Sequence, residues 1–116
     1  MRLLITGGSG LLGSKLTSIA VNREYETYSG YYKNKIYTGI PVPFDICNKK
    51  AVRSVFDRIR PDAVVHTAAL TDVDRCEEEK ELARNMNIDG TKNIVDSSID
   101  YDVFLVYIST DYVFSG

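Results

Sequence analysis

The sequence contains little sulfur, a single histidine and no tryptophan among its 116 residues. Cys47 and Cys76 are 29 positions apart, and His66 is the one histidine that could join them around a metal. This arrangement lacks the ligand spacing of a zinc site, so we expect two reduced thiols and no metal centre.

Long hydrophobic runs are also missing. The longest apolar run, residues 103–108, is far shorter than the roughly 18 residues that suggest a membrane-spanning helix. The N-terminus has Arg2 followed by three apolar residues and then glycines, without the long apolar region and cleavage site of a signal peptide. We therefore expect no membrane partner and a cytoplasmic location.

The net charge is only −2, and the 14 basic and 16 acidic residues are interspersed. The basic footprint of a nucleic-acid binder is absent, so no nucleic-acid partner is expected. Apolar residues make up 44% of the chain and charged residues 26%, which is typical of an ordinary globular domain. A chain of this length forms one domain.

Apolar runs suited to buried strands alternate with segments of helical period, and this alternation is typical of βα units around a parallel sheet. Because parallel crossovers are right-handed, five strands wound both ways from the first predict the order 3-2-1-4-5. The predicted fold class is therefore an α/β, Rossmann-type doubly wound parallel sheet. Its strands are expected at residues 2–6, 26–31, 42–45, 63–66 and 103–108.

Three helices are expected between these strands. The first covers residues 11–22, and the second carries apolar residues at helical spacing and ends near Arg60, before Pro61. The third begins near Glu77, and on one of its faces Gly90 is expected to allow close approach to the sheet.

Gly7, Gly10 and Gly13 form a turn between the first strand and the first helix. Such a turn needs a positive φ angle and room for a diphosphate near the backbone, which favours glycine. We expect the backbone amides between Thr6 and Leu12, including that of Leu11, to point at the diphosphate of a dinucleotide. A glycine turn without a ligand is the alternative. The absence of a Gly-Lys-Ser/Thr ending argues against a P-loop ATPase.

Residues 29–35 follow the second strand, where an acid would bind the adenosine ribose of NAD. No acid is present there, and Lys33 and Lys35 could attract a 2′-phosphate. NADP is therefore favoured over NAD as the cofactor. The alternative is that these lysines belong to a solvated turn.

Four segments together resemble the extended short-chain dehydrogenases/reductases, and within them the dTDP-4-dehydrorhamnose reductases and related nucleotide-sugar enzymes. They are Thr6-Gly-x-x-Gly-x-x-Gly13, Phe44-Asp-Ile46, His66-Thr-Ala-Ala-Leu-Thr71 and Ser109-Thr-Asp-Tyr-Val-Phe114. The resemblance covers the whole chain. It implies hydride transfer from NAD(P)H to C4 of a nucleotide-linked keto sugar, a step of dTDP-rhamnose biosynthesis, with the nucleotide sugar as partner.

The resemblance also implies roles for particular residues. The Thr110 hydroxyl is expected to hydrogen-bond the substrate carbonyl as a catalytic group, and Asp111 and Tyr112 are expected to contact the sugar. On the cofactor side, Asp45 and Ile46 would flank the adenine, and Asn87 would support the site from the third helix. Ala68, Ala69 and Thr71 would line the nicotinamide side. The alternatives are a turn role for Asp45, a capping role for Thr71 and a helix-surface role for Asn87.

The catalytic Tyr-x-x-x-Lys of the family is expected beyond residue 116. Tyr31-x-x-x-Lys35 has the same spacing but follows the second strand on the adenosine side, so it receives no catalytic role. Residues 103–108 would form an exposed apolar edge strand if no further chain covered them. Residues 1–116 are therefore expected to be the NAD(P)-binding part of a longer enzyme and inactive alone, and a homodimer stays open.

Two other functions remain open at this point. One is a non-catalytic NADP-binding protein like the regulatory subunit of methionine adenosyltransferase, which resembles the same subgroup. The other is a nucleotide-sugar epimerase or dehydratase. His66, at the end of a buried strand, is expected to be a hydrogen-bonded structural group rather than a catalytic base.

Overall fold

The computed structural model describes residues 1–7, 10–32, 38–68 and 77–109, with the backbone alone at 11, 68, 77–87 and 109. Strands and helices alternate along these residues, as expected, except that no helix of the described residues separates the second strand from the third. In chain order they are β1 (Arg2–Thr6), α1 (Leu11–Asn22), β2 (Glu26–Tyr31), β3 (Ile40–Pro43), α2 (Lys49–Ile59), β4 (Ala63–Ala68), α3 (Glu77–Asp100) and β5 (Phe104–Ser109).

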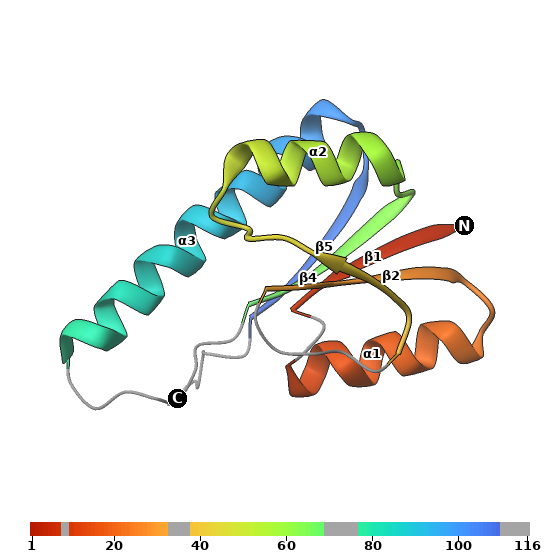
Figure 1. Ribbon diagram of the computed structural model, residues 1–116, viewed down its shortest axis with the longest axis horizontal. Coiled ribbons are helices and arrows are strands. Elements are labelled where there is room, and N and C mark those ends of the chain that lie inside the picture. Colours follow the sequence, from red (N-terminus) through yellow and green to blue (C-terminus); the bar gives the residue numbers. More distant parts are fainter. Residues whose placement is uncertain (8–9, 33–37, 69–76, 110–116) are drawn as a thin grey trace.

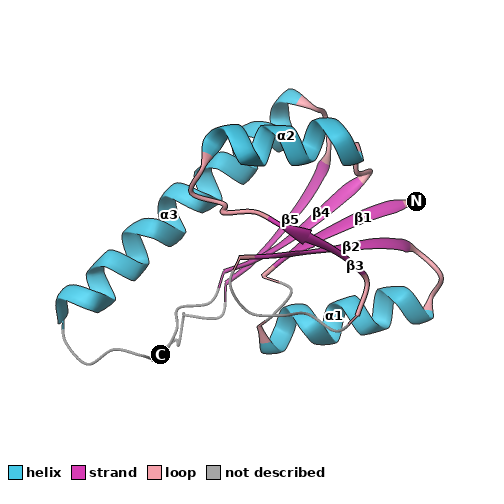
Figure 2. Cartoon of the chain, in the orientation of Figure 1, coloured by secondary structure: helices cyan, strands magenta, loops and turns pink. Residues whose placement is uncertain are grey.

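The five strands form one parallel sheet in the order β3-β2-β1-β4-β5, which confirms the predicted topology. Helix α1 lies on one face of the sheet, and α2 and α3 lie on the other (Figure 1). This division follows from the right-handed crossovers, because the chain moves one way from β1 to β3 and the opposite way from β3 to β5. The carboxyl ends of all strands consequently share one edge of the sheet (Figure 2).

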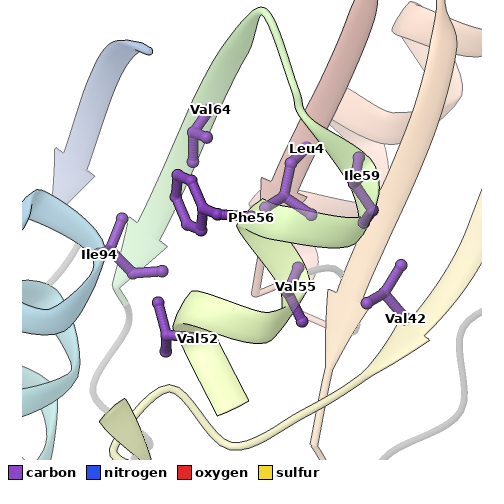
Figure 3. Close-up of a cluster of buried hydrophobic side chains, with 8 residues drawn as sticks. All are labelled: Leu4, Val42, Val52, Val55, Phe56, Ile59, Val64 and Ile94. Atoms are coloured by element: carbon purple, nitrogen blue, oxygen red, sulfur yellow. The ribbon is translucent and has the colours of Figure 1, made fainter. Parts of the chain in front are cut away.

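The hydrophobic core lies between the sheet and α2 (Figure 3). Val52, Val55 and Phe56 of α2 are almost completely buried against Leu4 of β1 and Val64 of β4. Asn48 is the N-cap of helix α2, and its side chain accepts a hydrogen bond from the Ala51 amide at 3.1 Å. The C-cap is Arg60, which adopts a left-handed conformation with φ of 52° immediately before Pro61. The predicted end of this helix is confirmed.

Strand β3 begins two residues earlier than predicted, at Ile40 instead of residue 42. Pro41 and Pro43 are compatible with this position because β3 is an edge strand and pairs only with β2. The strand stops before Asp45, whose carbonyl oxygen accepts a hydrogen bond from the Asn48 amide at 3.0 Å. A turn therefore replaces the end of the predicted strand.

Strand β5, in contrast, starts one residue later than predicted. The Val103 amide donates to the Ser98 carbonyl and so closes the end of α3. β5 lies at the other edge of the sheet, next to β4. Phe104 is 70% exposed there. Within the described ranges, no helix is long and apolar enough to cross a membrane.

Candidate functional site

The glycine turn after β1 is shaped by contacts with β4. Gly7 has a positive φ of 72°, as the turn was predicted to require. A Cβ atom at position 7 would lie 2.1 Å from the Thr67 hydroxyl oxygen and 2.8 Å from the Thr67 carbonyl oxygen. Both its backbone conformation and its neighbour therefore demand glycine at this position.

Gly10 closes the turn and precedes α1. Its amide donates to the Gly7 carbonyl oxygen at 3.0 Å, so this amide is engaged inside the turn. The prediction that all backbone amides from Thr6 to Leu12 face a diphosphate is therefore wrong for the Gly10 amide. The amides of Leu11, Leu12 and Gly13 are in the first turn of α1, where no partner exists within the helix.

The N-terminus of α1 has no side-chain cap. Gly10 is extended, with φ of −78° and ψ of 170°, and the first helical turn contains no acidic residue. Within the described residues, neither a cap nor an acid of the first turn competes with an external anion for the amides of Leu11, Leu12 and Gly13 or for the positive end of the helix dipole. The donor set therefore fits a diphosphate.

This helix terminus also has the position in the sheet where ligands of such folds bind. The chain leaves β1 toward β2 on one side, and β4 pairs with β1 on the other side. In open α/β sheets, ligands bind at the carboxyl ends of the strands where the connections change direction. Gly7 and Gly10 lie at that point.

A buried hydrogen-bonded group lies beside the turn. His66 Nδ1 is 2.5 Å from the Thr6 hydroxyl oxygen, and His66 Nε2 is 2.8 Å from the Thr91 hydroxyl oxygen of α3. The Thr67 hydroxyl donates to the Thr6 carbonyl oxygen at 2.8 Å. The imidazole stacks on the Tyr107 ring of β5, with 5.5 Å between ring centres.

Burial lowers the pKa of His66 from its ordinary value of 6.5 to about 4. The ring is therefore neutral at physiological pH, and both of its nitrogen atoms have hydroxyl partners. The expectation that His66 is a buried, hydrogen-bonded group is confirmed.

The segment after β3 is held by its own turn and by α3. An Asp45 carboxylate oxygen accepts from the Cys47 amide at 2.9 Å, and the Ile46 carbonyl accepts from the Asn93 side-chain amide at 2.9 Å. Burial and the nearby carboxylates of Asp45 and Asp89 raise the pKa of the Cys47 thiol. Cys47 is therefore a poor nucleophile in this position.

Gly90 has a different neighbour from the one predicted. A Cβ atom at position 90 would lie 2.4 Å from Ile46 Cδ1, so Gly90 makes room for the segment after β3 rather than for the sheet. Ile46, expected beside the adenine, is partly buried against the core and occupies this space on α3.

The residues predicted for the site are only partly within the described chain. Gly7, Gly10, Leu11, Leu12 and Gly13 lie together at the start of α1, Asp45 and Ile46 follow β3, Ala68 ends β4, and Asn87 is on α3. The others lie outside the described residues: Lys33, Ala69, Thr71, Thr110, Asp111 and Tyr112. No role was predicted for the hydroxyl of Thr6 or for Thr91. Strand alignment could have paired Thr6 with His66, whereas no sequence signal marks Thr91.

The fold and the turn define a Rossmann-type α/β domain, with a helix N-terminus suited to a dinucleotide diphosphate. The chain belongs to the family described as RmlD substrate binding domain, whose family model matches residues 1–116. Among curated proteins, it is 34% identical to dTDP-4-dehydrorhamnose reductase of Aggregatibacter actinomycetemcomitans, covering 99% of this chain and 36% of that protein. It is also 32% identical to methionine adenosyltransferase 2 subunit beta of Xenopus laevis, covering 99% of this chain and 34% of that protein.

Solved structures agree with this assignment. The crystal structure of a hypothetical dTDP-4-dehydrorhamnose reductase from Sulfolobus tokodaii has a TM-score of 0.83 and 38% identity, covering all of this chain and 41% of that one. UDP-glucose 4-epimerase of Thermus thermophilus in complex with NAD has a TM-score of 0.75 and 28% identity, covering 89% of this chain and 35% of that one. The chain spans about a third of the length of the curated relatives it matches.

Proposed function

We propose that the chain binds NAD(P) and forms the coenzyme-binding part of a reductase that acts on a nucleotide-linked 4-keto sugar. The observation that carries this proposal is the uncapped N-terminus of α1, which follows a glycine turn at the carboxyl edge of the sheet. The similarity of the chain to proteins named dTDP-4-dehydrorhamnose reductase supports the proposed reduction of a keto sugar. The substrate would then be a sugar nucleotide, as in dTDP-rhamnose biosynthesis.

The residues divide into a coenzyme set and a substrate set. In the coenzyme set, the amides of Leu11 and Leu12 are proposed to bind the diphosphate together with the glycine turn. Asp45 and Ile46 are proposed to flank the adenine, and Asn87 supports the site from α3. The nicotinamide side is assigned to Ala68, Ala69 and Thr71. When bound, the coenzyme supplies a hydride.

On the substrate side, the Thr110 hydroxyl is proposed to donate a hydrogen bond to the carbonyl oxygen of the keto sugar. Such a bond stabilises the negative charge that develops on this oxygen during reduction. Asp111 and Tyr112 are proposed to contact the sugar. The tyrosine and lysine that complete the family's catalytic set are expected beyond residue 116, so the chain alone is proposed to be inactive.

The coenzyme is proposed to be NADP rather than NAD. Residues 29–35 contain no carboxylate that would repel a 2′-phosphate, and Lys33 adds a positive charge.

A homodimer and a cytoplasmic location remain part of the proposal. Light scattering at two protein concentrations tests the dimer.

Calorimetric titration of the 116-residue chain with NADPH and NADH tests both the site and the coenzyme. We expect NADPH to bind more tightly, and Lys33→Ala to reduce the difference without changing NADH affinity. Lys50→Ala, at an exposed position on α2, is the matched control. A folded chain that gives no heat with either coenzyme would contradict the proposal.

A second function is favoured by the 32% identity to methionine adenosyltransferase 2 subunit beta. In that case the chain would bind NADP as part of a regulatory subunit without turnover. An epimerase is a third candidate, supported by the likeness to UDP-glucose 4-epimerase. NADPH oxidation with a dTDP-linked 4-keto sugar, measured on a protein that includes the Tyr-x-x-x-Lys segment, separates these functions. Net oxidation indicates a reductase, isomerised product an epimerase, and no turnover a regulatory subunit.

A further inference from the structure

His66 connects three elements at the carboxyl edge of the sheet. Its Cα partners are Thr6 in β1 and Tyr107 in β5, so the three side chains lie in one row across neighbouring strands. Thr91 reaches the same imidazole from α3. The ring is buried and is contacted on both nitrogen atoms and on one face. Its orientation is therefore fixed from outside its own strand.

The last residue before the glycine turn is held in two places by β4. The Thr6 hydroxyl pairs with His66, and the Thr6 carbonyl accepts from the Thr67 hydroxyl. The Thr6 carbonyl belongs to the peptide group that leads into Gly7, where φ becomes positive. The orientation at which the chain enters the turn thus depends on two consecutive residues of β4.

The side chains of Thr6, His66 and Thr91 can be connected by hydrogen bonds without any of them carrying a charge. A neutral imidazole has one donor and one acceptor nitrogen, and a threonine hydroxyl can serve in either role. Both ring nitrogen atoms are therefore satisfied in either tautomer. A neutral connection is also suited to its place, because a buried charge here would require a partner of opposite sign.

We propose that His66 is a positioning residue, which links Thr91 of α3 to Thr6 and thereby fixes the orientation at which the chain enters Gly7, ahead of the helix N-terminus that receives a diphosphate. The ligand named in this statement rests on the proposed function, whereas the effect on the turn does not. A perturbation of α3 at this position then changes the turn through the imidazole.

The first test measures the turn without any ligand. The Gly10 amide, bonded to the Gly7 carbonyl, reports on the turn, and the Arg60 amide, bonded to the Phe56 carbonyl, reports on the opposite end of the molecule. Thr91→Val keeps the shape of the side chain and removes the hydroxyl, whereas Thr91→Ser keeps the hydroxyl. We expect hydrogen exchange at Gly10 to become about fivefold faster in Thr91→Val, the ratio for one lost hydrogen bond of about 1 kcal/mol.

The ratio of the Gly10 rate to the Arg60 rate separates positioning from a general loss of stability, because a merely structural role would change both rates. Thr91→Ser is expected to restore the wild-type ratio. In a His66→Phe background, which keeps the stacking on Tyr107, Thr91→Val is expected to have no further effect. If His66→Phe does not fold, the two Thr91 variants still decide the question.

The second test uses NADPH titration of the same variants. Thr91→Val is expected to weaken binding about fivefold, and Thr27→Val, which removes a buried hydroxyl from β2, is expected to leave it unchanged. An unchanged Gly10 rate in Thr91→Val, or a faster rate with unchanged NADPH affinity, would overturn the positioning role. A faster Gly10 rate in a chain that binds no coenzyme at all would retain that role and overturn the proposed function instead.

Discussion

The two ends of the sheet are held together by different chemistry. At the amino end, Arg2 bonds to the Ile59 carbonyl at 2.9 Å and pairs with Glu26 at 3.3 Å, and Arg53 pairs with Asp100 at 2.6 Å. At the carboxyl end, the contacts beside the glycine turn are between neutral groups, namely threonine hydroxyls, the imidazole and a backbone carbonyl. The charged contacts are about half exposed, whereas His66 and the Thr6 side chain are buried.

Because of this difference, we expect substitutions to be tolerated better at the amino end of the sheet than at the carboxyl end. Exposed ion pairs are weak and screened by salt, so the amino end can lose one with little effect. Buried neutral groups have no water to replace a lost partner, so each loss at the carboxyl end is costly. The proposed coenzyme site is thus built on the less tolerant end.

The largest effect is expected from Gly7→Ala. An alanine at a φ of 72° costs about 1–2 kcal/mol, and its Cβ would overlap the Thr67 hydroxyl oxygen. We expect the free energy of unfolding to fall by about 3 kcal/mol and the heat of NADPH binding to disappear. Gly10→Ala is the matched control, because its φ is negative and its Cβ would lie 3.3 Å from the Gly7 carbonyl oxygen. Equal losses for both variants, measured by urea unfolding, would contradict the contact with Thr67.

Acid is expected to act on the carboxyl end through His66. The unfolded chain takes up a proton near pH 6.5, whereas the folded chain takes it up only near pH 4. The contribution of the neutral ring to the free energy of unfolding is therefore fully present above pH 6.5 and is lost as the pH falls toward 4. The total loss is expected to be about 3 kcal/mol. Urea unfolding between pH 7 and pH 4 measures this slope. His66→Gln should remove that part of the slope, and an identical slope in the variant would exclude His66 as its source.

A smaller effect is expected from Gly90→Ala on α3. The new methyl group would displace Ile46, at a cost that overpacking usually sets at about 1–3 kcal/mol, and better helix propensity offsets about 1 kcal/mol of this. We expect a net loss of about 1 kcal/mol by urea unfolding. Adding Ile46→Ala should make the double variant more stable than the sum of the two single changes predicts. Strict additivity would show that the two residues do not meet.

The smallest effect is expected from Arg53→Gln at the amino end. The Arg53 and Asp100 side chains are 44% and 51% exposed, so water screens the ion pair and its loss should lower the free energy of unfolding only slightly. Raising the salt concentration to about 1 M should abolish the difference from wild type. NADPH affinity should stay unchanged. A change in that affinity would break the separation between the two ends.

Local patterns predicted most of the architecture. Helix α1 and strands β1 and β2 have the predicted bounds, because short buried strands and a helical apolar stripe are visible in neighbouring residues. β3 was placed two residues too late, since its prolines resemble a loop and only an edge position makes them acceptable in a strand. Its true start depends on β2, which the local sequence does not contain.

The site was predictable where it depends on one segment. The glycine turn is such a segment, and Gly7 has the positive φ that was expected. The engagement of the Gly10 amide and the contact of Gly90 with Ile46 were not predictable, because they depend on how a turn closes and on which loop meets α3. The contacts of His66 join residues that are 60 and 25 positions away, and strand register brings them together.

The prolines of β3 have a consequence for how copies of this chain can meet. The Phe44 amide donates inward to Tyr31 of β2, so the alternate positions, Pro41 and Pro43, are those whose backbone nitrogen faces away from the sheet. Neither can donate to an added strand. The prolines therefore protect the β3 edge against strand addition from a second copy, without any charged side chain in the strand.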